Sequence, residues 1–299
     1  MKKPKKIAVL CSDLHLSLTQ PACRADKNWM NTQAHYLTQL EEIADGCPIL
    51  CAGDIFDKWN TPAELVTWTI RHLPPNFYAI PGQHDLPDHS IDQIHRSGYG
   101  VLQEVRAIYN TDDLRSNAMY LYDFPYGSEL KPLVHKEEGE IHVALVHRYI
   151  WLDRSNCYAG ASEEQNVLSY KSIFGTYDVV VIGDNHKRWR VHRENTVIYN
   201  CGCFIRRKSD EILYTPVVGI LYENGSVGVK LLDTSVDKFH ENAREREAAV
   251  MDMKEFIDAL EGLGEHGLNF REAVQRYIDK NSVPDKTKQI ILAALEPQG

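Results

Sequence analysis

The sequence predicts an α/β fold in which two β-sheets pack on each other and helices cover their outer faces. In the first third of the chain, short apolar runs typical of buried strands alternate with segments of helical spacing. After that, strand-like runs follow one another closely. A chain of 299 residues can bury such a core and still carry a small additional domain. We therefore expect a four-layer α/β/β/α sandwich with a small C-terminal helical appendage.

The first third of the chain predicts a parallel sheet. Apolar runs at 7–11, 48–52 and 77–80 have the length and composition of buried strands. The segments 28–45 and 61–73 lie between them and place apolar residues at helical spacing. Strand, helix and strand therefore follow one another as in a βαβ unit.

Two local patterns predict where helices begin. Thr61-Pro62-Ala63-Glu64 has the pattern of a capping box with proline at the first helical position. Ser90 is expected to cap a short helix that carries Ile91 and Ile94.

The rest of the chain predicts a second sheet and then a change of composition. A Glu223-Asn224-Gly225-Ser226 turn is expected to join the last two strands into a hairpin. Beyond about Val236 the sequence is charged and helix-forming, so we expect one domain over 1–236 and a helical segment over 237–299. The strands expected in this part are 119–124, 141–146, 179–182, 196–199, 217–222 and 227–232.

Composition excludes several function classes. The net charge of −9 comes from 42 acidic and 33 basic residues, so the chain is not a general binder of polyanions. No run of about 18 apolar residues occurs, and the apolar run after the basic start is too short for a signal peptide. The seven scattered cysteines include no CxxC pair, which favours buried reduced thiols over a zinc ribbon. We expect a cytoplasmic protein with no membrane partner.

The main functional signal is a set of polar clusters, each directly after an apolar run. Asp54 follows Gly53 at the end of such a run, where its carboxylate is well placed to bridge two cations. Four other clusters follow similar runs, so several strand ends are expected to converge on Asp54. A bridging carboxylate surrounded by such clusters is typical of a site that holds two cations. The four clusters are Asp13-Leu14-His15, Gly82-Gln83-His84-Asp85, Val146-His147 and Gly183-Asp184-Asn185-His186.

In this order, the clusters resemble the motifs of the calcineurin-like metallophosphoesterase family over roughly 7–232. Within that family, three features resemble the SbcD-type DNA repair exonuclease subunit and its bacteriophage relatives. They are Gly53-Asp54-Ile55-Phe56-Asp57, the helix opening at Thr61-Pro62, and the stretch 200–207. In such nucleases the last stretch corresponds to a glycine-containing turn followed by arginines.

The resemblance implies a role for each motif residue. Asp54 would bridge the two ions, His84 would contact phosphate and protonate the leaving oxygen, and Asp85 would orient the His84 ring. Asp57 is expected to accept a hydrogen bond near the site rather than to bind metal. The first ion would be held by Asp13, His15, Asp54 and His186, and the second by Asp54, Gln83, His147 and Asp184.

Two positions depart from the usual family pattern, and both belong to the second ion. Gln83 stands where the family most often has asparagine, and Asp184 stands where it most often has histidine. Both changes make the site richer in oxygen, which suits Mn²⁺ or Mg²⁺ better than Zn²⁺. A weakened second site is the alternative. We expect two divalent ions, with Mn²⁺ preferred.

Basic residues lie next to two of the motif stretches. Cations beside a phosphate-cleaving centre can hold a DNA backbone, and Trp189 can stack on an unpaired base. Ordinary surface charge on connecting loops is the alternative. The candidate substrate-binding residues are Lys187, Arg188, Arg190, Arg206 and Arg207.

The leading hypothesis is therefore a metal-dependent DNA nuclease, an exonuclease or endonuclease subunit that acts in recombination or repair. A phosphodiesterase for small or cyclic nucleotides and a phosphoprotein phosphatase are alternatives, because one such centre serves many phosphoesters. A scaffold with an inactive metal site is a third class, and the presence of His84 and Asp85 argues against it.

The resemblance also implies a partner. In SbcD-type complexes, helices that follow the phosphoesterase body grip the coiled-coil base of an SMC-like ATPase. A similar SbcC-type partner is expected for the segment 237–299. The alternatives are that these helices pack back on their own domain, or that the chain forms a homodimer. A bacteriophage-encoded protein of this kind would act in the cytoplasm of the bacterial host.

Overall fold

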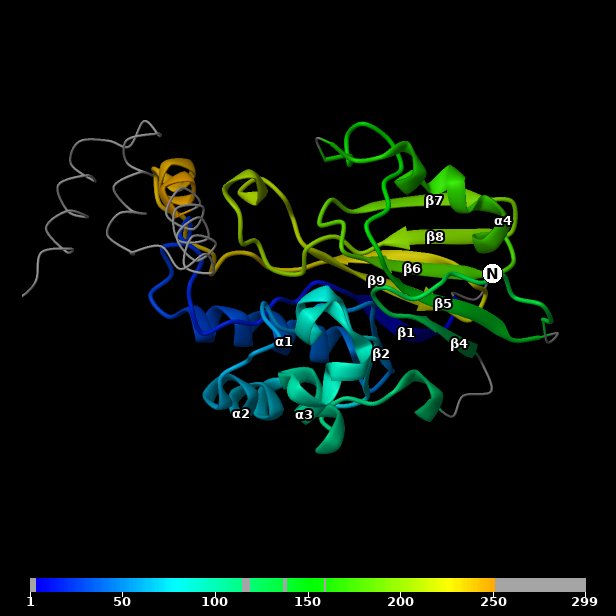
Figure 1. The fold of residues 1–299 in the computed structure, drawn as a ribbon, viewed down its shortest axis with the longest axis horizontal. Helices are drawn as coiled ribbons and strands as arrows, with labels where there is room; N and C mark the ends of the chain where they lie inside the picture. The colour runs from blue at the N-terminus through cyan, green and yellow to red at the C-terminus, as the bar shows by residue number, and fades with distance from the viewer. Residues whose placement is uncertain (1–3, 115–118, 137–138, 159, 251–299) are drawn as a thin grey trace, which may run out of the picture. The chain divides into compact units, whose positions relative to one another are not determined.

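The computed structural model describes residues 4–114, 119–136, 139–158 and 160–250 (Figure 1). The chain divides into two compact units, Met1–Phe239 and His240–Gly299. The first unit holds both sheets. Within the second unit, the chain is helical from residue 243 to 250, and the rest of the expected helical segment lies outside the described residues. None of the described helices combines the length and apolar character needed to span a bilayer.

The first sheet has the strand order β10–β9–β1–β2–β3. Strands β1, β2 and β3 run parallel, and α1 and α2 connect them as the sequence predicts. The predicted hairpin of β9 and β10 adds to the other edge of β1, with β9 antiparallel to it. The bounds are β1 Lys6–Cys11, α1 Trp29–Ala44, β2 Ile49–Cys51, α2 Ala63–His72, β3 Phe77–Ala79, β9 Val217–Tyr222 and β10 Val227–Leu231.

The second sheet has the order β4–β5–β6–β8–β7, with β4, β5, β6 and β8 parallel. Edge strand β7 was not predicted, because its charged residues suggested a connecting loop. Its exposure alternates as in an edge strand, with Trp189 buried and Arg190 exposed, and it pairs antiparallel with β8. The bounds are β4 Met119–Phe124, β5 Ile141–His147, β6 Val179–Gly183, β7 Trp189–Arg193 and β8 Thr196–Asn200.

Three apolar clusters define the four layers. The central cluster joins the facing sides of the two sheets, for example Leu10 and Leu50 with Val143 and Val181. One outer cluster packs α1, α2 and α3 (Gly98–Glu104) on the first sheet. The other covers the second sheet, where α4 (Lys171–Phe174) lies (Figure 1). The predicted α/β/β/α sandwich is confirmed.

The helix starts differ from the predicted capping patterns. Helix α2 begins at Ala63 with Pro62 as its N-cap, and the Thr61 hydroxyl donates to the Lys58 carbonyl at 2.8 Å. The expected capping box is therefore wrong, because the Thr61 side chain is used by the preceding turn. Ser90 precedes a 3₁₀ helix but its side chain does not cap it. The 3₁₀ helices are η1 Gln83–Asp85, η2 Pro87–His89, η3 Ile91–Arg96, η4 Thr111–Asp113, η5 Glu163–Gln165, η6 Val167–Tyr170 and η7 Ser209–Glu211.

Candidate metal centre

The polar clusters meet at the carboxyl ends of β1, β2, β5 and β6. Three groups of side chains place one potential ligand atom each within 4.8 Å of the others. Asp13, His15 and Asp54 each belong to two of these groups, so the three groups adjoin one another. The groups are Asp13, His15 and His186; His15, Asp54 and His84; and Asp13, Asp54 and His147.

The backbone that presents these side chains is unusual. Four non-glycine motif residues have positive φ angles: Asp13 at 55°, His15 at 46°, Asp54 at 57° and Asp184 at 86°. This conformation is unfavourable for residues with a β-carbon and tends to persist where surrounding structure enforces it, often at functional sites. The loops after β1, β2 and β6 are therefore held in the conformation that turns the side chains inward.

Two glycines allow the loops to approach this closely. A β-carbon at Gly82 would collide with Asp54 Oδ1, and one at Gly53 would collide with His147 Nδ1. Gly53 also has a φ of 97°, which favours glycine. Both motif glycines are thus required by close packing around Asp54 and His147.

Asp54 has one oxygen committed to the protein and one free. Its Oδ1 accepts a hydrogen bond from the His84 backbone N–H at 2.9 Å. Its buried Oδ2 has no hydrogen-bond partner among the described residues, and it faces His147 Nε2 at 3.4 Å and His15 Nε2 at 3.7 Å. Burial alone would raise the pKa of Asp54, but His147 and His84 together outweigh burial and lower that pKa. The free oxygen is an anionic acceptor directed at two imidazoles.

The His147 ring is oriented from the opposite side. Its Nδ1 lies 2.6 Å from the Ala52 carbonyl oxygen, and since a carbonyl only accepts, Nδ1 carries the hydrogen. The lone pair on Nε2 is then directed toward Asp54, and this buried atom also lacks a hydrogen-bond partner among the described residues. Nε2 and Asp54 Oδ2 are then two acceptors that face each other, and a proton on Nε2 removes their repulsion unless a cation lies between them. Desolvation opposes that proton, yet Asp54 raises the pKa of His147 well above its ordinary value.

His15 and His186 converge in the same way, with their Nε2 atoms 3.1 Å apart. On the far side of the second ring, His186 Nδ1 lies 3.5 Å from Glu211 Oε1. Glu211 is buried, and its Oε2 accepts hydrogen bonds from the backbone N–H groups of Arg207 and Lys208 at 2.6 and 3.0 Å. Sequence analysis missed Glu211, because it lies in a stretch that carries no motif.

The donor set fits divalent cations. Among the described residues, buried carboxylate and imidazole atoms face one another without hydrogen-bond partners. Carboxylates are normal ligands for Mn²⁺, Mg²⁺ and Zn²⁺, and imidazoles suit transition metals such as Zn²⁺. Gln83 and Asp184 are also at the site, where Gln83 Nε2 donates to Asp184 Oδ1 at 3.1 Å. Asp184 is in none of the three convergent groups found among the described residues. Ligand roles for Gln83 and Asp184 stay predictions.

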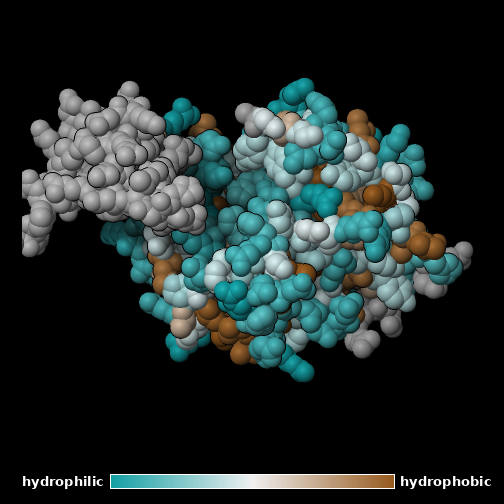
Figure 2. All heavy atoms as spheres, viewed as in Figure 1, coloured by the Kyte–Doolittle hydropathy of each residue, from teal (hydrophilic) through white to brown (hydrophobic). Residues whose placement is uncertain are grey.

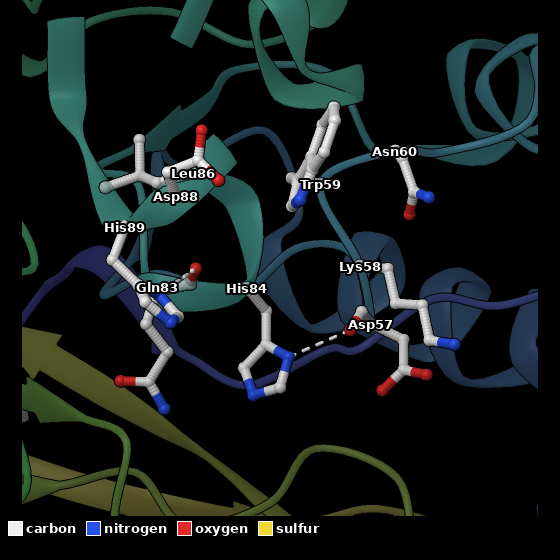
Figure 3. Close-up of a pocket in the computed structure, with 9 residues that line it drawn as sticks. All are labelled: Asp57, Lys58, Trp59, Asn60, Gln83, His84, Leu86, Asp88 and His89. Atoms are coloured by element: carbon white, nitrogen blue, oxygen red, sulfur yellow. Dashed lines mark hydrogen bonds between the residues drawn. The ribbon is translucent and has the colours of Figure 1, made fainter. Parts of the chain in front are cut away.

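His84 is oriented by a different partner from the one expected. Its Nδ1 lies 2.8 Å from the backbone oxygen of Asp57, the contact dashed in Figure 3. The predicted role of Asp85 as the orienting group is wrong. The fully buried Asp85 carboxylate accepts hydrogen bonds from the backbone N–H groups of Gly82, Phe56 and Ile55, at 3.0 to 3.2 Å. Burial raises the pKa of Asp85 to about 7. Asp85 therefore joins the 53–57 loop to the turn that carries His84.

Several residues of the basic stretches are committed to the fold. Trp189 is 5% exposed and its Nε1 donates to the Ile150 carbonyl at 3.3 Å, so the expected base stacking by Trp189 is wrong. Arg190 donates to the Val227 carbonyl. Arg206 pairs with Asp237, with 2.7 Å between Nε and Oδ2. The side chains of Arg190 and Arg206 are engaged in structural contacts rather than directed at the candidate ligands.

The other basic candidates differ in position. Arg207 Nη2 lies 2.7 Å from Asp57 Oδ1, and its charge contributes, after desolvation, to a lowered pKa of His15. Lys187 Nζ lies 4.3 Å from the centre of the Tyr158 ring, and Arg188 is exposed. Among the five candidates, Arg207 is the one whose contacts place it beside the convergent side chains.

The fold and this centre define a metallophosphoesterase. Residues 8–188 match the calcineurin-like phosphoesterase family, and because this is more than half of the chain, the protein belongs to that family of hydrolases. No curated protein matches the sequence closely enough to count as a relative.

Similar solved structures include an archaeal phosphodiesterase, 15% identical, covering 75% of this chain and 99% of that one, with a TM-score of 0.39. A metallophosphoesterase from Sphaerobacter thermophilus is 14% identical, covering 90% of this chain and 97% of that one, with a TM-score of 0.37. A putative 5'-nucleotidase from Staphylococcus aureus is 12% identical, covering 82% of this chain and 58% of that one, with a TM-score of 0.42.

Proposed function

We propose that this metallophosphoesterase is a DNA nuclease of the SbcD type, which hydrolyses DNA phosphodiester bonds in repair or recombination. The observation that carries hydrolysis is the buried Asp54 Oδ2, which lies between the Nε2 atoms of His15 and His147 and has no hydrogen-bond partner in the described part of the chain. Two divalent ions bound at such a centre would supply an activated water and neutralise the charge on phosphate. Asp13, His15, Asp54 and His186 would hold one ion, and Asp54, Gln83, His147 and Asp184 the other.

The protein's own groups position and protonate the substrate. Because His84 Nδ1 donates to the Asp57 carbonyl, Nε2 is the atom available to exchange a proton with the leaving oxygen. The Asp57 backbone fixes the ring, and the Asp85 carboxylate fixes the loop that contains Asp57 and Phe56. Arg207, paired with Asp57, places a cation beside the centre, where it favours an anionic phosphate.

The resemblance of two stretches of the sequence supports DNA as the substrate. The 53–57 and 200–207 stretches resemble those of SbcD-type nucleases, and the second contains Arg207. Asn200, which begins that stretch, donates to the backbone oxygens of Asn185 and Lys187 at 2.6 and 3.1 Å. The turn therefore braces the loop that carries His186.

A nuclease assay tests this proposal. End-labelled single- and double-stranded DNA is incubated with Mn²⁺, with Mg²⁺ or without metal, and bis-p-nitrophenyl phosphate is run in parallel. We expect metal-dependent DNA cleavage that is fastest with Mn²⁺ and is lost in Asp54→Asn. Hydrolysis of the small diester without any DNA cleavage would overturn the DNA assignment and favour a phosphodiesterase of small nucleotides.

We also propose that residues 240–299 dock on an SMC-like ATPase. The resemblance supports this proposal, and the end of the first unit offers a well-anchored place for a truncation. Phe239 ends the first unit, and the guanidinium carbons of Arg24 and Arg206 lie 4.6 and 5.2 Å from the centre of its ring. Arg24 is fully buried and pairs with Asp26 and Asp237 at 2.7 and 2.9 Å. Truncation after Phe239 leaves this network complete.

The truncated chain 1–239 tests the docking proposal. We expect it to hydrolyse bis-p-nitrophenyl phosphate like the full chain but to lose co-purification with the cognate ATPase. Full ATPase binding by the truncated chain would contradict docking through this segment. Loss of the folded catalytic unit, detected by circular dichroism, would instead indicate that the helices pack on their own domain.

A further inference from the structure

We propose that the pocket between His84 and Trp59 is a subsite for the nucleobase of the leaving nucleoside, with Trp59 as its stacking surface. This inference rests on the proposed function, because it assumes that the substrate is a nucleotide diester. The resemblance assigns no role to Trp59.

The pocket has a volume of about 370 Å³, which lies within the range of about 300–1,000 Å³ typical of small-molecule sites. Figure 3 shows His84, Trp59 and Leu86 around it. Lys58, Asn60 and Gln83 also line it. It thus combines a flat aromatic ring and an aliphatic side chain with amide groups that can bond the edge of a base.

His84 determines which part of the substrate enters. Its Nε2 is the atom that serves the leaving oxygen, and the ring is itself a wall of the pocket. The group attached to that oxygen therefore lies in or next to the pocket. For a nucleotide diester, this group is the leaving nucleoside, and its base is the part that matches an aromatic wall.

The Trp59 ring is supported from outside the pocket. The Arg96 guanidinium carbon lies 5.6 Å from the ring centre, and Arg96 lines a neighbouring hollow of about 400 Å³ rather than the pocket. Trp59 and Asn60 line both hollows. The second hollow is also lined by Ile70 of α2 and Val101 of α3, which are exposed, and Figure 2 shows hydrophobic surface in the region of these two helices. Arg96 therefore contacts the indole without lining the pocket, so the part of the ring that lines the pocket stays available to a ligand.

The charges around the pocket also fit a neutral base. Its two carboxylates have arginine partners, Asp57 with Arg207 at 2.7 Å and Asp88 with Arg96 at 4.0 Å. The exposed Lys58 adds a cation that suits the adjoining phosphate. The positive charge of Lys58 opposes a cationic group, so a neutral aromatic base is the better occupant.

Four dinucleoside monophosphates test the subsite: TpT, TpX, XpT and XpX, where X is an abasic tetrahydrofuran residue. Each contains one diester bond, and the product that carries the phosphate identifies the leaving side. With Mn²⁺ bound, we expect the wild type to prefer a base on the leaving side. Trp59→Ala should lower kcat/KM on the order of tenfold to hundredfold for substrates with a base on the leaving side. It should leave kcat/KM for XpX unchanged. Trp59→Phe should retain most of the preference.

Tyr120→Ala, which removes a partly exposed aromatic residue on β4, is the matched control and should cleave all four substrates normally. Three results for Trp59→Ala would overturn the subsite. They are an equal loss of kcat/KM on XpX and TpT, no loss on any substrate, and a loss that depends on the base of the nucleoside that keeps the phosphate. Cleavage of dinucleotides without cleavage of long DNA would refute the nuclease and keep the subsite. If no diester is cleaved, the proposed nuclease activity is refuted. The subsite is then tested by calorimetry, which compares the affinity for thymidine monophosphate with the affinity for the abasic phosphate. Tighter thymidine binding that Trp59→Ala abolishes would support it, and equal binding would overturn it.

Discussion

The side-chain amide of Gln83 donates to Oδ1 of Asp184, with the two atoms 3.1 Å apart. The two residues are far apart in the sequence. Gln83 lies in the turn after β3 in the first sheet, and Asp184 follows β6 in the second. They are also the two positions that the resemblance marks as departures from the usual family motif. The two departures are complementary, because Gln83 supplies the N–H donor and Asp184 supplies the oxygen that accepts its hydrogen bond.

This complementarity predicts non-additive effects of substitution. Gln83→Asn shortens the side chain by one methylene, and Asp184→His removes the acceptor carboxylate, so each should weaken Mn²⁺ binding about tenfold. The double variant carries asparagine and histidine, the pair that the usual family motif has at these positions. It should bind Mn²⁺ more tightly than the product of the two single effects predicts. A coupling energy of about 0.5–3 kcal/mol is expected for residues in contact. Mn²⁺ titrations of all four proteins measure it, and strictly additive losses would show that the pair does not act together.

Substitutions of His84 and of Asp54 are expected to have different effects. His84→Ala should lower kcat by about 10²–10⁴-fold at unchanged metal content, because the imidazole acts on the leaving group. Asp54→Ala should lose bound metal, because it removes the oxygen that faces His15 and His147. Metal analysis of the purified variants, with bis-p-nitrophenyl phosphate kinetics, separates the two. Equal metal depletion in His84→Ala would place His84 among the ligands.

Most of the fold could be predicted from the sequence, because buried parallel strands consist of apolar runs that need no context to be recognised. Strand β7 could not, since an edge strand keeps charged residues on its exposed positions and resembles a loop. For the same reason Trp189 was predicted to stack on bases, although its indole packs in the core of the second sheet.

The candidate centre was predictable where a motif places a side chain at or shortly after the end of a strand, as at Asp13, Asp54 and His147. Roles that depend on distant backbone were not. Whether Asp85 bonds the His84 ring or three backbone N–H groups depends on how the 53–57 loop folds against it. Glu211 reaches His186 only through the tertiary structure.

Glu211 is predicted to be a positioning residue for His186. Glu211→Gln keeps an oxygen for the backbone N–H groups of Arg207 and Lys208 but removes the carboxylate charge beside His186 Nδ1. We expect Mn²⁺ affinity to fall about 10–100-fold, with little change in thermal stability. The exposed neighbour Asp210, changed to Asn, is the control and should bind Mn²⁺ normally. Unchanged affinity in Glu211→Gln would refute the role.

Metal affinity should depend steeply on pH. Burial raises the pKa of Asp13 to about 6, despite the opposing influence of His186, so below pH 6 the metal-free protein holds a proton that a cation must displace. His147, whose pKa is also raised, adds a second such proton. Affinity for Mn²⁺ is therefore highest at alkaline pH and should fall at least about tenfold per pH unit below pH 6. Titrations between pH 5 and 8 measure this, and a flat profile would contradict it.

The central claim is that these side chains form one centre for two divalent ions with Asp54 between them. Anomalous scattering from crystals soaked in Mn²⁺ tests it most directly. The account predicts two peaks that flank the Asp54 carboxylate, one beside Asp13, His15 and His186, and the other beside His147. A single peak, or no peak within reach of Asp54, would contradict it.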